Sequence, residues 1–355
     1  MRFRFSCFLI LLVLGFLPSA VLADFPATVI DCLGRKVLLE KMPQRIVITG
    51  RAGFMITNAS LFFASAPEKL LTYSKNFQFR NSDGFYRLID PFFAKRTFSD
   101  HTIGIEELAA MKPDLIMARD IERANLERGL EQLEIPIVFF NLENPESYYS
   151  DLENLGLIYA ETQKAERIID FFQNWHQKIL QSVKSSKSER KPSVLHLFYS
   201  ERGGAVSFSV SPKHWIQSTL VRDAGGVPVW SEAALGNGWQ KIGFEQIAAW
   251  NPDFIFVASY FGNSADAVEK LKKNELWQGL TAVKQNRLLA FPEDYISWDQ
   301  PDSRWVLGLC WCAAMINPDL QGLKVDMHKL YQEFFELYGI DAEQSRKIKV
   351  TGDYF

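Results

Sequence analysis

The chain of 355 residues has few histidines and cysteines, the residues that most often bind transition metals. Its five histidines are His101, His176, His196, His214 and His328, and no two of them have the short spacing typical of a zinc site. We therefore expect no resident metal and no other cofactor.

The motifs of common enzyme classes are also missing. The sequence has no G-x-S-x-G elbow, no P-loop and no G-x-G-x-x-G turn. Glu293 and Asp294 are neighbouring carboxylates, but adjacency alone does not make an acid/base pair. Asp100 and His101 could form half of a catalytic triad, but no serine can be assigned as its nucleophile. We expect no catalytic activity. An exported enzyme on the same scaffold is the alternative from a different functional class.

An excess of positive charge is lacking as well. The formal net charge is −3, whereas proteins that bind nucleic acid usually carry a basic patch or domain. We therefore expect no nucleic-acid partner.

Only one long apolar run occurs, and it lies at the start of the chain. Residues 8–17 are apolar, Arg2 and Arg4 precede them, and the triplet ending at Ala23 suits a signal peptidase. The run is shorter than the roughly 20 apolar residues of a membrane span. The expected mature terminus, Asp24, is not a cysteine that could carry a lipid. These features predict a signal peptide (1–23) cleaved after Ala23, and a soluble, unanchored protein of the periplasm.

Three cysteines remain beyond this segment: Cys32, Cys310 and Cys312. Their odd number excludes complete pairing, and Cys310 and Cys312 lie two positions apart in an expected helix, where they face different directions. We expect all three to pack in the interior. A disulfide from Cys32 to one of the other two is the alternative.

The most informative pattern is an internal repeat. Residues 104–118 read GIEELAAMKPDLIMA and residues 243–257 read GFEQIAAWNPDFIFV, with identical residues at seven of fifteen positions. Each copy predicts a short helix, a Pro-Asp break and a buried strand, because proline ends a helix. The period of 139 residues is far longer than the roughly 20–50 residues of a solenoid unit. We interpret the repeat as one motif from each of two similar lobes.

The rest of the chain supports this division. An alternating segment around Leu33-Gly34 predicts a hairpin, and residues 45–49, 135–140, 193–199 and 287–291 predict strands separated by helices. A helical tract covers residues 144–186 with a break near 160–163, and a charged linker follows at 184–191. Further helices are expected near 55–66, 83–95, 303–317 and 323–338.

The predicted fold class is therefore α/β: two similar parallel-sheet lobes with flanking helices, joined by a single long α-helix. The expected domains are an N-terminal lobe (24–143), a connecting helix and linker (144–190) and a C-terminal lobe (191–355).

At this level the chain resembles the periplasmic substrate-binding proteins of iron–siderophore, haem and cobalamin ABC importers, the class with two lobes joined by a long helix. The resemblance rests on the opening D-x-x-G-R-x-V and P-x-R-I-V segments (residues 31–37 and 43–47), the doubled E-x-[LI]-A-A-x-x-P-D motif and the joining helix. It spans nearly all of the chain after the signal peptide.

The resemblance implies that a metal chelate binds between the lobes and that one glutamate on each lobe docks onto arginines of a transmembrane permease. By motif position these are Glu106 and Glu245. Carboxylates on a rim that meet cationic pockets contribute orientation and association rate. The alternative is that both glutamates stabilise the first turns of their helices, where a carboxylate complements the helix dipole. We expect a monomer.

Ligands of open parallel sheets bind beyond the carboxyl ends of the strands. Arginines there suit carboxylates and other oxyanions, and tyrosine and tryptophan offer flat apolar faces. The candidate ligand-binding residues are Arg51, Tyr86, Arg119, Tyr199, Trp239, Tyr260, Trp298 and Arg304.

The ligand class stays open in two respects. Residues 297–319 resemble a subgroup of the same family whose ligands include molybdate and tungstate, so a small oxyanion is an alternative to the chelate. A sensor or scavenger that never meets a permease would keep the ligand site without needing both docking glutamates.

Overall fold

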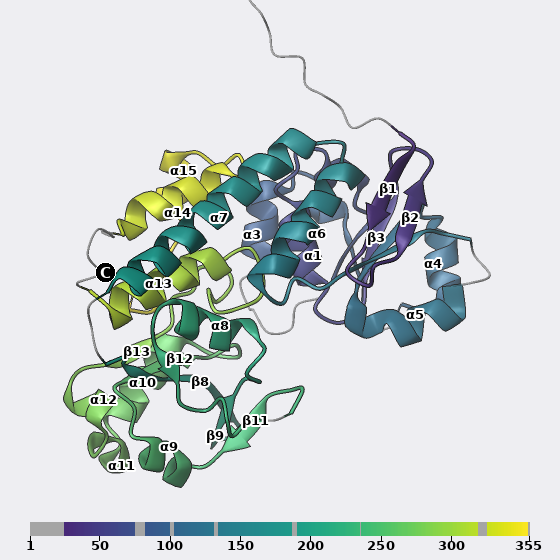
Figure 1. Ribbon diagram of the computed structural model, residues 1–355. Helices are drawn as coiled ribbons and strands as arrows, with labels where there is room; N and C mark the ends of the chain where they lie inside the picture. The colour runs from purple at the N-terminus through teal and green to yellow at the C-terminus, as the bar shows by residue number, and fades with distance from the viewer. Residues whose placement is uncertain are drawn as a thin grey trace, which may run out of the picture.

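The computed structural model describes residues 25–74, 82–99, 103–130, 134–186, 190–234, 236–318 and 325–353. The expected signal peptide, the Asp100-His101 pair and part of the charged linker lie outside the described residues. The described part forms two α/β lobes with helix α7 running between them (Figure 1).

The first described element is the expected hairpin. Strands β1 (Ala27–Ile30) and β2 (Lys36–Leu39) pair in antiparallel fashion. Between them the Asp31 carboxylate accepts backbone N–H groups from Leu33 and Arg35, and Gly34 has a φ of +75°, which glycine adopts readily. The Arg35 guanidinium donates to Asp31 and to the carbonyl of Ile137. The D-x-x-G-R segment thus forms the turn and fastens it to the N-terminal lobe.

The N-terminal lobe contains two parallel strand groups, β3-β6-β7 and β4-β5, which meet where Leu70 bridges to Ile46 beside β3. Its strands are β3 (Ile46–Thr49), β4 (Thr72–Ser74), β5 (Thr97–Ser99), β6 (Leu115–Arg119) and β7 (Ile137–Phe140). Its helices are α1 (Phe54–Ser60), α2 (Ala66–Lys69), α3 (Ser82–Ile89), α4 (Ile105–Met111), α5 (Arg123–Leu130) and α6 (Pro145–Ile158), with 3₁₀ turns at η1 (Phe93–Lys95) and η2 (Asp120–Glu122).

The C-terminal lobe has a larger sheet in the order β11-β9-β8-β12-β13, with β10 also paired to β8. Its strands are β8 (Ser193–Arg202), β9 (Ala205–Val210), β10 (Val227–Pro228), β11 (Gln240–Ile242), β12 (Phe254–Ala258) and β13 (Leu288–Ala290). Its helices are α8 (Ile216–Asp223), α9 (Phe244–Trp250), α10 (Ser264–Lys272), α11 (Glu275–Gln278) and α12 (Thr281–Lys284). Strands β8, β12 and β13 are parallel as expected. The short parallel strand β10 and the antiparallel strands β9 and β11 were not expected.

The two repeat copies fold alike, as α4–β6 and α9–β12. Each helix follows a glycine in extended conformation, and each ends at a residue with left-handed backbone, Lys112 (φ +46°) or Asn251 (φ +36°). Proline and aspartate then lead into a strand that is buried along its whole length. The predicted helix, break and strand are confirmed in both copies.

The aspartate of each copy anchors the neighbouring strand. Asp114 accepts the backbone N–H groups of Gln44 and Arg45 at 2.8 Å, just before β3. Asp253 accepts the backbone N–H and the hydroxyl of Ser193 at 2.7 Å, where β8 begins. The aspartate of each repeated Pro-Asp pair therefore ties its own strand to a neighbouring strand, β6 to β3 and β12 to β8.

The joining helix is confirmed as α7 (Thr162–Ser185), which covers the lobes on one side (Figure 1). The expected break before it lies at Ala160, whose φ is +56°. Three helices close the described chain: α13 (Trp305–Ile316), α14 (Met327–Glu336) and α15 (Ala342–Arg346). Helix α13 packs against α7 and α8, whereas α14 extends to the N-terminal lobe, where Phe334 contacts Phe62.

The three cysteines expected after the signal peptide all lie among the described residues. Cys32, Cys310 and Cys312 are free thiols, with Cys310 and Cys312 buried and Cys32 exposed. The expectation of interior packing is therefore wrong for Cys32, which lies in the hairpin turn.

Over the described ranges, no helix has the length and apolar character needed to cross a membrane.

Candidate ligand-binding cavity

A cavity of about 880 Å³ lies where the two lobes meet. Helix α3 contributes its wall from the N-terminal lobe, and the loops after β12 and β13 contribute the wall from the C-terminal lobe. Residues that follow α15 complete the lining. The lining residues are Asp83, Gly84, Arg87, Tyr260, Gly262, Asn263, Asp266, Glu293, Asp294, Tyr295, Lys347, Lys349 and Thr351.

Close packing of the two lobes holds α3 in place. A Cβ atom at Gly84 would lie 2.7 Å from the Tyr295 ring, closer than carbon atoms can approach, so glycine permits this contact. The next residue, Phe85, is fully buried, and its ring centroid lies 6.0 Å from that of Tyr295. The cavity wall therefore depends on direct contact between α3 and the loop after β13.

A buried polar chain lies beneath the cavity in the C-terminal lobe. The Tyr260 hydroxyl donates to Asp299 at 2.5 Å, and Nε2 of His196 lies 2.9 Å from the same carboxylate. Burial raises the pKa of Tyr260 well above its ordinary value, so its hydroxyl keeps the proton that it donates. Burial alone would raise the pKa of Asp299, but the neighbouring His196 and hydrogen-bonding groups lower it. Tyr260 is thereby held with its ring at the cavity.

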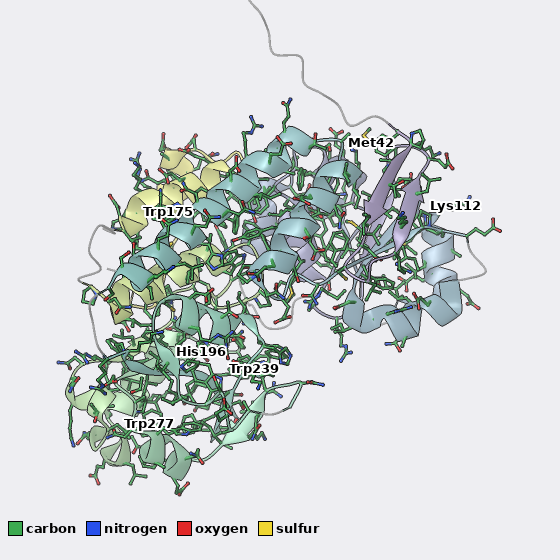
Figure 2. All side chains as sticks on the ribbon, in the orientation of Figure 1. Met42, Lys112, Trp175, His196, Trp239 and Trp277 are labelled. Carbon is green, nitrogen blue, oxygen red and sulfur yellow. The ribbon has the colours of Figure 1, made fainter. Side chains whose placement is uncertain are left out.

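Aromatic side chains continue from Tyr260 across the same lobe. The ring centroid of Phe198 lies 4.6 Å from that of Tyr260 and 5.1 Å from that of Trp239. Trp239 in turn contacts Trp215 at 5.6 Å. Trp239 and His196 are labelled in Figure 2, where both lie in the C-terminal lobe. This aromatic cluster, Phe198, Trp215, Trp239 and Tyr260, reaches the cavity lining through Tyr260.

The cavity carries charges of both signs. Its cations are Arg87, Lys347 and Lys349, and its carboxylates include Asp83 and Asp266. The guanidinium of Arg87 lies over the Phe93 ring, 4.5 Å from its centroid, which orients it.

Two further carboxylates, Glu293 and Asp294, line the cavity. Burial raises the pKa of Glu293 to about 7, so it changes charge near neutral pH. Asp294 is paired with Arg304, whose Nε donates to it at 2.6 Å. At neutral pH the charges on the lining are therefore close to balanced.

A smaller cavity of about 340 Å³ adjoins the first and shares Gly262, Asn263 and Asp266 with it. Its far wall includes Tyr199 and Glu201 at the end of β8. The Tyr199 hydroxyl donates to Glu201 at 2.9 Å.

Three of the eight candidate ligand residues lie at these features. Tyr260 lines the main cavity, Tyr199 lines the smaller one, and Trp239 belongs to the aromatic cluster. Both remaining arginines lie in the N-terminal lobe: Arg51 follows β3 as expected, whereas Arg119 is the last residue of β6 itself. Arg51 is exposed and pairs with Glu122 at 2.9 Å, whereas Arg119 is buried and pairs with Glu143 at 3.1 Å.

The other three candidates lie in the interior. Tyr86 belongs to helix α3, within the helix expected near 83–95, and packs among Tyr73, Phe85 and Phe93. Trp298 and Arg304 are each 0% exposed. The sequence shows that these side chains follow strands, but it does not show that the segment 294–304 turns inward between the lobes.

Arg304 is the centre of this interior network. Besides Asp294, its guanidinium lies 3.5 Å from Asp302 and over the ring of Phe85, 4.3 Å from the centroid. Asp302 accepts a hydrogen bond from Asn58 of α1 at 2.7 Å. The segment after β13 is therefore fastened to two helices of the N-terminal lobe.

Sequence reasoning missed several residues of the lining. The rule that ligands bind beyond strand ends could have selected Asn263 and Asp266, which follow β12, and Glu293 and Tyr295, which follow β13. No local signal marks Asp83 on α3 or the lysines after α15, because only the packing of the lobes brings them to the cavity.

Glu106 and Glu245 occupy the same position, the second residue of α4 and of α9. Both are exposed. A Cβ atom at Gly243 would lie 2.8 Å from Oε2 of Glu245, so this carboxylate lies near the start of its own helix. Gly104 has no such neighbour within 4 Å. The alternative to docking, a stabilising role in the first turn, thus has geometric support for Glu245.

Within the part of the chain that the structure describes, no group of three or more His, Cys, Asp or Glu side chains is arranged to hold a metal ion. His176 is buried between the Tyr149 hydroxyl and Asp223, at 3.0 and 2.9 Å, and so links α6, α7 and α8.

Two lobes, a joining helix and a cavity between the lobes define a solute-binding protein. The family model of periplasmic binding proteins matches residues 87–295, more than half of the chain, and the protein belongs to this family.

Individual relatives are distant. The ABC transporter substrate-binding lipoprotein YvrC of Bacillus subtilis is 24% identical, over 83% of this chain and 87% of its own length. The molybdate-binding protein MolA of Haemophilus influenzae is 22% identical, over 67% and 70%. The solved structure of MolA bound to molybdate has a TM-score of 0.73 at 16% identity, covering 91% of this chain and all of that chain. These similarities confirm the fold.

Proposed function

We propose that this protein is the periplasmic binding component of an ABC importer and that it captures a metal chelate for delivery to a transmembrane permease. It is exported by its signal peptide, performs no chemistry and acts by binding and modest lobe closure. Family membership and the name of the YvrC relative support the role in transport.

The observation that carries the ligand class is the size and lining of the cavity between the lobes. A volume of about 880 Å³ lies within the range of roughly 300–1,000 Å³ that holds ligands the size of drugs and cofactors. The aromatic cluster suits a chelator with apolar or conjugated parts, and the cations suit its carboxylates or other oxyanions. The Fe(3+) dicitrate-binding protein FecB of Escherichia coli, 26% identical over 52% of this chain, is a relative whose name specifies such a ligand.

The second candidate is a molybdate-type oxyanion, which the similarity to MolA favours. A tetrahedral anion would fill only a small part of the cavity and would leave the aromatic cluster without a role. Binding measured against ferric dicitrate, cyanocobalamin and molybdate separates the two candidates. The proposal expects a chelate to bind more tightly than molybdate, and the reverse order would favour the oxyanion.

Delivery to a permease requires a docking surface, for which we propose Glu106 and Glu245. They are exposed at equivalent positions of the two lobes. The double variant Glu106→Arg and Glu245→Arg should abolish uptake of the ligand by cells while leaving the ligand affinity of the purified protein unchanged. Unchanged uptake would refute docking through these residues.

A matched control makes the same charge reversals elsewhere. Glu153 on α6 and Glu166 on α7 are also exposed carboxylates. Glu153→Arg with Glu166→Arg should transport normally. Equal loss of transport in both double variants would indicate a general effect of charge.

A further inference from the structure

Residues 347–353 follow the last helix, α15, and run back across the end of the C-terminal sheet. Three of them, Lys347, Lys349 and Thr351, line the main cavity. We call residues 347–353 the strap. It belongs to neither repeat copy, and it forms a third wall beside α3 and the loops after β12 and β13.

Backbone hydrogen bonds hold the strap against the loop after β13. The N–H of Thr351 donates to the carbonyl of Glu293 at 2.8 Å, and the N–H of Glu293 donates to the carbonyl of Thr351 at 3.0 Å. The Thr351 hydroxyl also donates to the Glu293 carboxylate at 3.2 Å. This pair of residues forms an antiparallel bridge directly at the cavity.

The end of the strap is anchored in the same way. The N–H of Asp353 donates to the carbonyl of Ala290 at 3.0 Å, and the indole N–H of Trp311 donates to the carbonyl of Asp353 at 2.8 Å. Gly352 has a φ of +96°, and a Cβ atom there would lie 2.8 Å from the Phe291 carbonyl oxygen. Only glycine fits this close turn, so the strap is a built part of the cavity.

The strap also supplies two of the three cations in the cavity lining. Without Lys347 and Lys349, the cation left among the lining residues would be Arg87, against Asp83, Asp266 and two further carboxylates. Such a site would repel anions. With the two lysines present, the charges on the lining are close to balanced, and Lys347 also pairs with Glu343 at 2.8 Å.

We infer that the strap is a specificity element of the binding site, and that Lys347 and Lys349 allow the cavity to accept ligands of net negative charge. The inference rests on the proposed function and deepens it, because it opens the ligand class to anionic chelates. Since both lysines lie at an exposed rim, each contributes modestly to the affinity.

The test compares wild type with a double variant that carries both Lys347→Gln and Lys349→Gln. The probes are ferric dicitrate as an anionic chelate, cyanocobalamin as a neutral one and molybdate as a small anion, each titrated by tryptophan fluorescence. We expect the double variant to bind the anionic probe about tenfold more weakly and this difference to shrink at high salt. The control Lys284→Gln with Lys329→Gln removes two exposed lysines from other surfaces and should bind like wild type.

Equal anion affinity in the double variant and wild type would overturn the inference. Binding of cyanocobalamin but neither anion would also overturn it, while leaving the proposed function in place. Binding of none of the three probes would count against the proposed function, and the strap is then judged by a measurement that needs no ligand.

That measurement is hydrogen exchange at Glu293. Thr351→Pro removes the N–H that donates to the Glu293 carbonyl and should speed exchange of the backbone amides in residues 293–295. Thr351→Ala keeps the N–H and should exchange as wild type does. Unchanged exchange in Thr351→Pro would show that the strap does not support the cavity wall, and the inference would fail.

Discussion

Replacing Arg304 by methionine should destabilise the protein far more than removing an exposed arginine. Arg304 is 0% exposed and is the cation closest to two buried carboxylates, Asp294 at 2.6 Å and Asp302 at 3.5 Å. Methionine fills a similar volume but leaves both carboxylates without compensation. Breaking a buried ion pair in this way costs about 3–5 kcal/mol.

The assay is urea unfolding of wild type and Arg304→Met, followed by far-ultraviolet circular dichroism. Arg123→Met is the matched control, because Arg123 pairs with Glu127 at 2.8 Å on an exposed face of α5. Removing that pair should leave the stability close to that of wild type, because water screens an exposed ion pair. Arg304→Lys keeps the charge but loses the planar guanidinium over Phe85, so its stability should fall between wild type and Arg304→Met.

The pH dependence supplies a second check of the same reasoning. Burial raises the pKa of Asp302 to about 6, although the nearby Arg304 opposes the rise. Without Arg304 the Asp302 carboxylate would bind a proton more readily, so the cost of Arg304→Met should shrink between pH 8 and pH 5. A cost below about 1 kcal/mol at pH 8, or a cost that does not depend on pH, would refute the assignment of Arg304 as a buried structural residue.

Two further predictions concern the anchoring aspartates and Glu293. Asp114→Ala and Asp253→Ala should each lower the free energy of unfolding in urea by about 2 kcal/mol. The loss should be larger for Asp253→Ala, because Asp253 also pairs with Arg190 at 2.9 Å. Losses below about 0.5 kcal/mol would show that the Pro-Asp pair does not anchor the strands. The folded-state pKa of Glu293, about 7, exceeds its ordinary value of 4.5, so the folded protein binds more protons and stability should fall as pH rises from 4.5 to 7. Glu293→Gln should reduce this pH-dependent loss in the free energy of unfolding by up to about 3 kcal/mol. If the free energy of unfolding of variant and wild type changes equally with pH, the raised pKa of Glu293 is contradicted.

The parts of the fold that sequence patterns predicted are those governed by local rules. Pro113 and Pro252 end their helices wherever the surrounding chain lies, and a buried strand follows each of them. The break at Ala160 and the hairpin at Gly34 are likewise local. The antiparallel strand β9 also had a local signal, since Gly203-Gly204 joins two strands with positive φ at both residues, but that turn was not recognised.

The site was harder to predict because it depends on contacts between distant segments. An arginine after a strand looks like an exposed charge, and only the fold places Arg304 between Asp294 and Phe85. Helix α3 and the strap carry no motif, yet both line the cavity. Tyr260 was found because a strand end directly precedes it, which is the one positional rule that relates sequence to a ligand site in parallel sheets.

The central claim, capture of a metal chelate between the lobes, is tested most directly by native mass spectrometry of protein isolated from the periplasm, with elemental analysis of the same sample. We predict a complex that carries an added mass on the order of several hundred daltons, together with iron or cobalt in equal amount to the protein. Molybdenum or tungsten with only the small added mass of an oxyanion would contradict the claim.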